Sequence, residues 1–171
     1  MTRNKCSFKY ILANKAETEA LGASLAKIAA PGDVIALKGT LGSGKSVLAR
    51  AFIGKYSKPA ENIPSPTFTL VQSYDMGFVP VYHFDLYRII NPEETIELGI
   101  EEAFSDGISL IEWPERLGSY LPKDHLEIWL RVNNKDSIRN IRLAGSKSWQ
   151  PRLNNLFSEE TPNAWSRQSN Y

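Results

Sequence analysis

Apolar residues recur along the chain with the periods of helices and strands in turn, which predicts an α/β fold. Leu21, Leu25 and Ile28 stand at positions i, i+4 and i+7, and they predict the apolar face of a helix over residues 17–30. A Pro-Gly pair follows and ends that helix. The next apolar run, residues 33–38, is short and flanked by a turn signal, so it predicts a buried strand.

The remaining chain divides into short strand-like runs, three helical stretches and one long loop. Runs rich in β-branched and aromatic residues predict strands at 67–74, 79–87, 107–113, 125–132 and 138–144. Helices are expected at 45–56, 91–104 and 149–157, with Asn91 as the cap of the middle one. Three prolines indicate a loop at 57–66. Because two strand pairs are joined by short turns, we expect three layers around a mixed, partly antiparallel sheet.

The length and composition describe one domain without a membrane segment. The chain has 171 residues, and we expect one domain over 1–157 and a polar tail over 158–171. Its apolar runs are too short to span a membrane, and its N-terminus lacks a signal-peptide pattern. The single cysteine, Cys6, excludes an internal disulfide and fits the cytoplasm. Twenty Lys and Arg against 19 Asp and Glu argue against a dominant nucleic-acid-binding face.

Residues 39–46, GTLGSGKS, match the phosphate-binding pattern G-x-x-x-x-G-K-[ST] completely. The match follows a predicted strand and opens a predicted helix, which is the context that this loop requires. Its three glycines let successive backbone N–H groups point at phosphate oxygens, and the helix N-terminus adds its positive dipole end. Lys45 is expected to neutralise the β- and γ-phosphates and Ser46 to offer its hydroxyl to Mg²⁺. The sequence therefore predicts a P-loop NTPase-like domain.

A P-loop protein also needs a carboxylate at the end of a second strand, and this chain offers two. Asp85 and Glu112 each end an apolar strand, where a charge is costly unless something compensates it. Spacing alone does not choose between them. The guanine-recognition element N-K-x-D fails because Ser137 stands where the aspartate is needed after Asn134 and Lys135. Adenine is therefore the expected base.

Four segments together resemble the TsaE (YjeE) family, small P-loop ATPases of bacterial tRNA threonylcarbamoyladenosine synthesis. They are GTLGSGKS, SPTFTLVQSY, YHFDLYR and IEWPER, and the resemblance covers about residues 7–143. The resemblance implies that ATP is bound by a set of residues in the first helix, the P-loop and a switch-like loop: Thr18, Gly39, Thr40, Leu41, Gly42, Ser43, Gly44, Lys45, Ser46 and Thr67.

The resemblance also implies the catalytic and metal positions. Ser46 and Glu112 take the Mg²⁺ positions, Glu112 directly or through a water, and Asp85 lies near the γ-phosphate as a water-orienting or metal-shell acid. Lys45, Asp85 and Glu112 are the expected catalytic residues. Thr67 at the start of a strand and Thr18 at the start of a helix also fit ordinary structural roles.

The same resemblance implies Mg²⁺-dependent ATP hydrolysis that acts on a partner complex of TsaD and TsaB, with tRNA contacted indirectly through that complex. Two rival classes are a small-molecule kinase and a binding module in which nucleotide only gates an interface.

Trp113 either packs the strand end or covers the pocket, and Arg88 pairs with an acid, faces a partner or acts as an arginine finger. His83 is expected to be structural.

The C-terminal part has a basic bias that comes from Arg139, Arg142, Lys147 and Arg152. These side chains fit either a solvated surface or a contact with tRNA.

Overall fold

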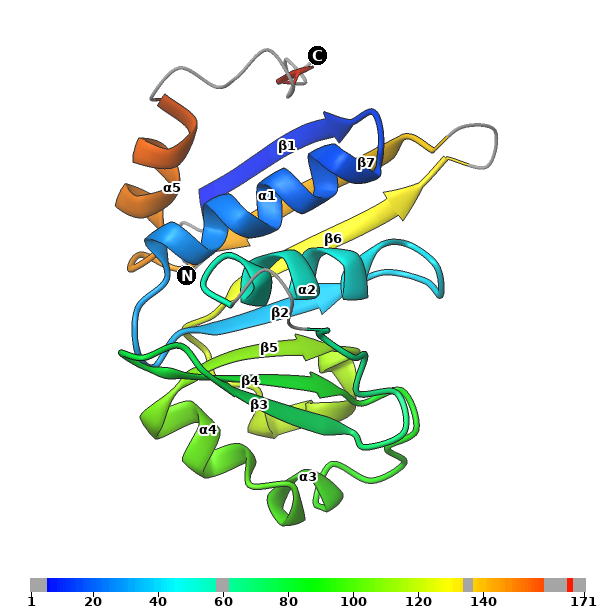
Figure 1. Ribbon diagram of the computed structural model, residues 1–171, viewed down its shortest axis with the longest axis vertical. Coiled ribbons are helices and arrows are strands. Elements are labelled where there is room, and N and C mark those ends of the chain that lie inside the picture. Colours follow the sequence, from blue (N-terminus) through cyan, green and yellow to red (C-terminus); the bar gives the residue numbers. More distant parts are fainter. Residues whose placement is uncertain (1–5, 58–61, 134–136, 159–165, 168–171) are drawn as a thin grey trace.

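The computed structural model of the chain describes residues 6–57, 62–133, 137–158 and 166–167. Its strands form one mixed sheet in the order β3-β4-β5-β2-β6-β7-β1-β8 (Figure 1). The strands are β1 (Cys6–Leu12), β2 (Val34–Lys38), β3 (Val71–Asp75), β4 (Pro80–Asp85), β5 (Ile108–Glu112), β6 (Leu126–Val132), β7 (Arg139–Gly145) and β8 (Ser166–Arg167).

The centre of the sheet is parallel and both of its sides are antiparallel. β2 pairs in parallel with β5 and β6, and β4 pairs in parallel with β5. The pairs β3–β4, β6–β7, β7–β1 and β1–β8 are antiparallel. The α/β class and the mixed sheet predicted from the sequence are therefore confirmed.

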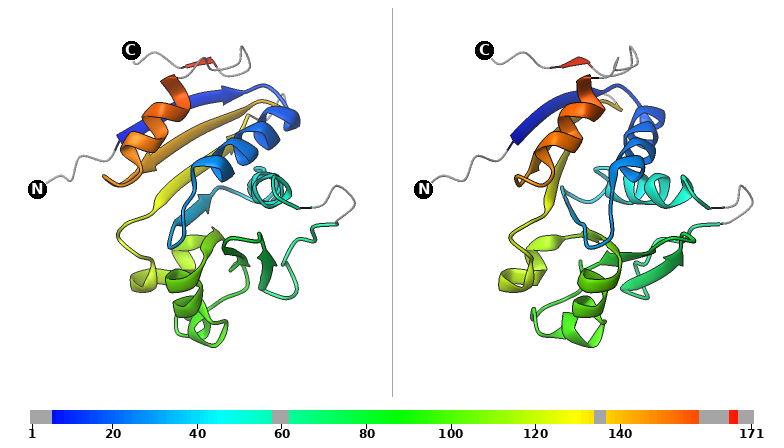
Figure 2. Two further views of the ribbon diagram at one scale, coloured as in Figure 1. Left: turned by 60° about the vertical axis from the view of Figure 1, so that its left-hand side comes forward. Right: turned by 90° about the vertical axis from the view of Figure 1, so that its left-hand side faces the viewer.

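Helices cover the two faces of the sheet unequally. One face carries α1 (Lys15–Ile28), α2 (Lys45–Gly54) and α5 (Gln150–Ser158), and the other carries α3 (Glu94–Glu97), α4 (Ile100–Asp106) and the 3₁₀ segment η1 (Pro114–Tyr120) (Figure 2). The first core joins the first three helices to β1, β2, β6 and β7, whereas the second lies against β2, β4 and β5. β5 serves both cores, because Leu110 faces one and Ile111 the other.

The first strand was not predicted, although its pattern has the period of a strand. Tyr10 and Leu12 are buried against the first core, whereas Lys9 before them is exposed and Ile11 between them is half-buried. The run pairs over its whole length with β7. Its partners lie at the other end of the chain, so no neighbouring hairpin signalled it.

The helix predicted over residues 91–104 is two helices, and this prediction is wrong in detail. Gly99 adopts φ +77° between α3 and α4, a left-handed conformation that breaks the helix. The cap also differs, because Asn91 is not the residue that caps α3. Instead the Glu94 carboxylate accepts the backbone N–H groups of Ile90 and Asn91, at 3.2 and 2.7 Å.

The strand predicted over residues 67–74 begins only at Val71. Residues 67–70 form a turn, closed by a 2.8 Å hydrogen bond from the Leu70 N–H to the Pro66 carbonyl. Leu70 has φ +66°, which is costly for a residue with a Cβ. Its carbonyl accepts the Asp85 N–H at 2.9 Å, so this turn is attached to the end of β4.

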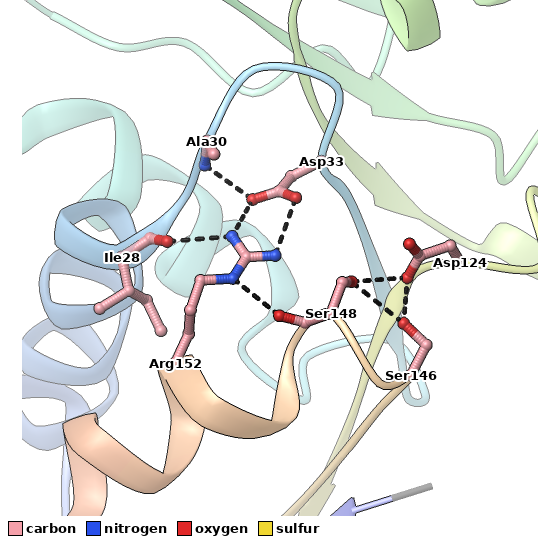
Figure 3. A network of polar contacts seen from close by, with 7 residues as sticks. All are labelled: Ile28, Ala30, Asp33, Asp124, Ser146, Ser148 and Arg152. Atoms are coloured by element: carbon pink, nitrogen blue, oxygen red, sulfur yellow. Dashed lines mark hydrogen bonds and ion pairs between the residues drawn. The ribbon is translucent and has the colours of Figure 1, made fainter.

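Arg152 on α5 ties the last helix to the loop that leads into β2 (Figure 3). Its Nη1 and Nη2 lie 2.6 and 3.1 Å from the Asp33 carboxylate oxygens, and Nη1 also donates to the Ile28 carbonyl at 3.0 Å. Beside it, the Asp124 carboxylate accepts hydrogen bonds from the hydroxyls of Ser146 and Ser148. Arg152, for which the sequence fits either a solvated surface position or a contact with tRNA, thus holds α5 in place.

Two sequence predictions fall outside the described residues. They concern Asn134 and Lys135, and most of the tail over 158–171. Ser158 ends α5, and Ser166–Arg167 pair with Ile11 and Tyr10 of β1. In the described part of the chain, no helix is long and apolar enough to cross a membrane.

Candidate functional site

The loop between β2 and α2 has a shape that only glycine permits at several positions. Gly39, Gly42 and Gly44 have φ of +149°, +75° and +106°. A Cβ added to Gly39 would lie 2.5 Å from the Leu130 carbonyl oxygen. At Gly44 it would lie 2.8 Å from Nε of Arg139. The chain therefore curls tightly before α2 begins, as a phosphate-binding loop requires.

Lys45 directs its ammonium group back over this loop. Its Nζ donates to the carbonyls of Gly39 and Thr40, at 2.7 and 2.8 Å, and lies 4.3 Å from the centroid of the Trp113 ring. The residue is only 4% exposed. Burial lowers the pKa of Lys45, and the carboxylates of Glu112 and Asp85 oppose that shift.

Glu112 is a buried carboxylate held between a hydroxyl and an imidazole. The Ser46 Oγ lies 2.9 and 3.1 Å from its two oxygens, and the His83 Nε2 lies 2.8 Å from Oε1. Glu112 is 3% exposed. Because a carboxylate oxygen needs a donor, Nε2 is the nitrogen that carries the proton. This geometry compensates the acid that ends an apolar strand.

Asp85 lies beside Glu112 because β4 and β5 run in parallel with these two residues in register. Two acids therefore sit at the same carboxyl edge of the sheet, next to the P-loop. Burial raises the pKa of Asp85; the N–H of Tyr87, 3.1 Å from Oδ1, opposes this, while the Glu112 charge adds to it.

These groups surround a pocket of about 250 Å³. It is lined by the P-loop, the ends of β4 and β5, the turn before β3 and the first residue of β7: Leu41, Gly42, Ser43, Gly44, Lys45, Ser46, Val47, Thr67, Asp85, Tyr87, Glu112, Trp113 and Arg139. The structure thus brings together most of the residues that the sequence singled out, including Thr67, whose hydroxyl is 3.0 Å from that of Ser65.

Thr18 lies apart from this pocket. It is fully buried in α1, and its hydroxyl donates to the Asn14 carbonyl at 3.5 Å. A contact between Thr18 and a nucleotide requires α1 to move, so that role stays a prediction. Gly39 and Thr40 belong to the loop but do not line the pocket; their carbonyls hold Lys45.

Two further residues belong to the site although the sequence did not predict them there, and a third, Trp113, fulfils both of the roles that the sequence left open. His83 was expected to be structural, yet it contacts Glu112. Arg139 was counted with the basic C-terminal residues, yet its Nε donates to the Ser43 carbonyl at 3.0 Å. Trp113 both packs against the second core and lines the pocket, with φ +60°. Such strain in a non-glycine residue is typical of functional sites.

The donor set at the pocket fits Mg²⁺ that is shared with a phosphate chain. Among the described residues, no group of three or more His, Cys, Asp or Glu side chains is placed to hold a metal by itself. A hydroxyl in contact with a carboxylate beside a phosphate-binding loop is a different arrangement. Mg²⁺ commonly takes one or two protein oxygens and completes its shell with phosphate and water. Ser46 and Glu112 meet that requirement.

Strand, glycine-rich loop and helix, with two acids at the adjoining strand ends, place the chain in the P-loop NTPase class of folds. A sequence profile described as "Threonylcarbamoyl adenosine biosynthesis protein TsaE" matches residues 12–141. The chain belongs to this TsaE family, which serves the biosynthesis of threonylcarbamoyladenosine in tRNA.

Individual relatives agree with this assignment. A Rickettsia felis protein named tRNA threonylcarbamoyladenosine biosynthesis protein TsaE is 42% identical over 122 residues, which cover 71% of each chain. A Bacillus subtilis protein of the same name is 36% identical over 129 residues, covering 75% of this chain and 80% of that one. The crystal structure of Bacillus subtilis YdiB superposes with a TM-score of 0.75 at 28% identity, covering 92% of this chain and 98% of that chain.

Proposed function

We propose that this protein is a cytoplasmic, Mg²⁺-dependent ATPase that supports threonylcarbamoyladenosine synthesis in tRNA. The observation that carries the proposal is the contact of Ser46 with Glu112 directly beside Lys45 and the P-loop. In this contact, the Ser46 hydroxyl, which a P-loop offers to Mg²⁺, touches the Glu112 carboxylate, the acid that would complete the metal shell. Family membership supplies the process in which the activity is used.

The loop residues bind the triphosphate. The backbone N–H groups from Gly42 to Ser46 surround the phosphates, and Lys45 moves its ammonium from the loop carbonyls to the phosphate oxygens. Mg²⁺, when bound, supplies positive charge at those oxygens. Trp113 stacks near the Lys45 ammonium and keeps water from that side of the pocket.

Asp85 orients the attacking water. Its carboxylate is buried at the end of β4, on the pocket wall beside Glu112. Because burial raises its pKa, Asp85 accepts a proton more readily than an exposed aspartate does. Catalysis then consists of positioning water in line and stabilising charge on the γ-phosphoryl group.

Turnover by the isolated chain is expected to be slow and to rise with partners. Arg88 lies outside the set of pocket residues, with its guanidinium 4.8 Å from the centroid of the exposed Phe68 ring, and Arg139 is engaged with the Ser43 carbonyl. Arg88 therefore does not line the pocket, and the Nε of Arg139, which does line it, donates to the loop. We infer that a complex of TsaB and TsaD completes the site, and that ATP turnover changes the state of that complex.

ATPase measurements with and without TsaB and TsaD test this proposal. Free phosphate should form with Mg²⁺ and ATP, and the rate should rise when the partners are added. Lys45→Ala should weaken ATP binding, whereas Glu112→Gln should retain binding and lower the rate by about 100-fold or more. Phosphate on an acceptor, or a rate equal in both variants and the native chain, contradicts the proposal.

A further inference from the structure

The face of β6, β7 and β1 that points away from α1, α2 and α5 is not covered by the second core. That core contains no residue of these three strands. On this side Ala144 is buried and Ile11 and Glu127 are half-buried, whereas Lys9, Trp129, Arg131 and Arg142 are exposed. With the adjoining end of β2, they form what we call the open sheet face: Lys9, Lys38, Glu127, Trp129, Arg131 and Arg142.

One row of this face crosses four strands. Lys38 is in register with Trp129, Trp129 with Arg142, and Arg142 with Lys9. Adjacent strands are about 4.8 Å apart, so the row extends over about 14 Å. Arg131 lies two residues further along β6, diagonal to Arg142. The row therefore combines an indole with several cations on a flat surface.

Three of the four cations of this face have no ion-pair partner among the described residues. Lys38 pairs with Glu127 at 3.0 Å, but among the described residues neither Lys9, Arg131 nor Arg142 makes an ion pair. Two like charges directly opposite across strands, as at Lys9 and Arg142, destabilise a sheet. A polyanion laid across the row removes that repulsion. The near-neutral net charge conceals this local excess, because six of the 19 acids lie within residues 93–106.

The Trp129 side chain is held by neighbouring residues and is partly exposed to solvent. Its Nε1 donates to the Glu127 carboxylate, and the Lys38 ammonium lies 4.8 Å from its ring centroid. The side chain is nevertheless 43% exposed. An indole fixed on a sheet among cations offers a stacking surface for a base and contacts for the adjoining phosphates.

We infer that the open sheet face binds single-stranded or looped RNA, with Trp129 stacking on a base and Arg131, Arg142 and Lys9 contacting phosphates. The choice of RNA among polyanions rests on the proposed function, but the face is separate from the nucleotide pocket. An acidic protein segment would use the same cations without needing the ring. The contact is weak and salt-dependent, and it adds to whatever the partner complex supplies.

Fluorescence anisotropy of an unmodified tRNA transcript, titrated with the full chain at low salt, tests this inference. With three cations on phosphates, affinity should fall by roughly twentyfold for a fourfold rise in salt. Arg142→Glu and Trp129→Ala should each weaken binding by about tenfold, and Trp129→Phe should retain most of it because a ring remains. Lys27→Glu, the same charge change on exposed α1, should have little effect.

Nucleotide binding distinguishes this inference from the proposed function. Arg142→Glu should bind a non-hydrolysable ATP analogue as the native chain does, and Lys45→Ala should still bind tRNA. Absence of tRNA binding at low salt overturns the inference. It is also overturned if Lys27→Glu weakens binding as much as Arg142→Glu, or if polyglutamate competes as well as RNA and Trp129→Ala is neutral.

Discussion

His83 donates to Glu112 from a fully buried position, and its other ring nitrogen has no hydrogen-bond partner among the described residues. The ring therefore acts on the site only through Nε2, which fixes the direction of the carboxylate. Ser46 holds the same carboxylate from the other side. A buried acid between two donors keeps one orientation, as a metal-shell ligand should.

Replacement of His83 tests this positioning role. His83→Phe keeps an aromatic ring at this buried position but removes the donor, and we expect kcat to fall by about tenfold or more, in the range found for supporting partners of metal ligands. His83→Gln keeps a donor and should recover part of the loss. The Mg²⁺ concentration at half-maximal activity should rise in His83→Phe. Equal activity of both variants would mean that the contact is only structural.

Asp85 lowers stability as the pH rises. Its folded-state pKa is raised, so between its unfolded value and the folded one the native chain holds more protons than the unfolded chain. Stability therefore decreases across that window. Asp85→Asn removes the effect and should raise Tm near neutral pH by about 2–4 °C, the shift that ~1 kcal/mol gives in a domain of this size.

Thermal unfolding of both proteins at several pH values checks this. The difference in Tm should be small below pH 4 and grow as pH rises through the window. A variant that is less stable than the native chain at neutral pH would contradict the assignment. ATP turnover should be lost in the more stable variant, because the charge serves the reaction.

At the scale of single residues, the sequence predicted many of the residues that line the pocket. Lys45 and Ser46 followed from one motif, and the acids followed from their places after apolar strands. His83 and Arg139 could not be placed, because their partners lie 29 and 96 residues away. No local pattern encodes such a contact.

The packing of α1 on α2 shows how an element supports the P-loop. A Cβ on Gly22 would lie 2.5 Å from the Leu48 carbonyl oxygen and 3.0 Å from the Ala51 Cβ, so the two helices approach closely only with glycine here. Gly22 and Leu48 are both buried. Because α2 starts inside the P-loop, its position also sets the position of the loop.

Gly22→Ala should force the helices apart and cost about 1–3 kcal/mol of unfolding free energy, as overpacking does. Gly54→Ala is a matched control, because its Cβ would meet only Ile63 at 3.5 Å, an ordinary contact. It should be neutral or stabilising by up to about 1 kcal/mol. Urea denaturation compares the two. Equal effects in both variants would exclude the close approach as the cause.

At the scale of elements, the sequence predicted the central elements best. The strand before the P-loop, β2, has an unbroken apolar run, whereas β1 mixes polar and apolar residues and its partners are distant. The break at Gly99 escaped because glycine is tolerated inside helices, and only the left-handed φ of this residue ends α3. The late start of β3 reflects the turn at Leu70, whose strain no propensity indicates.

At the scale of the whole molecule, Arg152 joins parts that are 119 residues apart in sequence. Its guanidinium contacts the Asp33 carboxylate with two nitrogens and lies 3.9 Å from the centroid of the Trp149 ring. The charge of the guanidinium, its planar shape and its stacking on the Trp149 ring all contribute to this contact. Arg and Lys are not equivalent at such a site.

Arg152→Ala should lower the free energy of unfolding by about 2–3 kcal/mol, because it leaves the half-buried Asp33 carboxylate without its cation and with the Ala30 N–H as its remaining described donor. Arg152→Lys should recover less than half of this. Chemical denaturation measures both. Arg142→Ala, which removes an exposed cation that makes no described ion pair, is the control and should be neutral or slightly stabilising, because Lys9 lies directly opposite. Full recovery by lysine would show that charge alone suffices.

The pairing of β1 with β7 has a consequence for folding during synthesis on the ribosome. Residues 6–12 leave the ribosome long before their hydrogen-bonding partners, residues 139–145. The β1–β7 pair cannot form until residues 139–145 have been translated. This contact between segments far apart in the sequence therefore delays the final folding step. Until then β1 and β6 each lack the strand that pairs with them, and a chain stalled before residue 139 would expose these edges to chaperones or to aggregation.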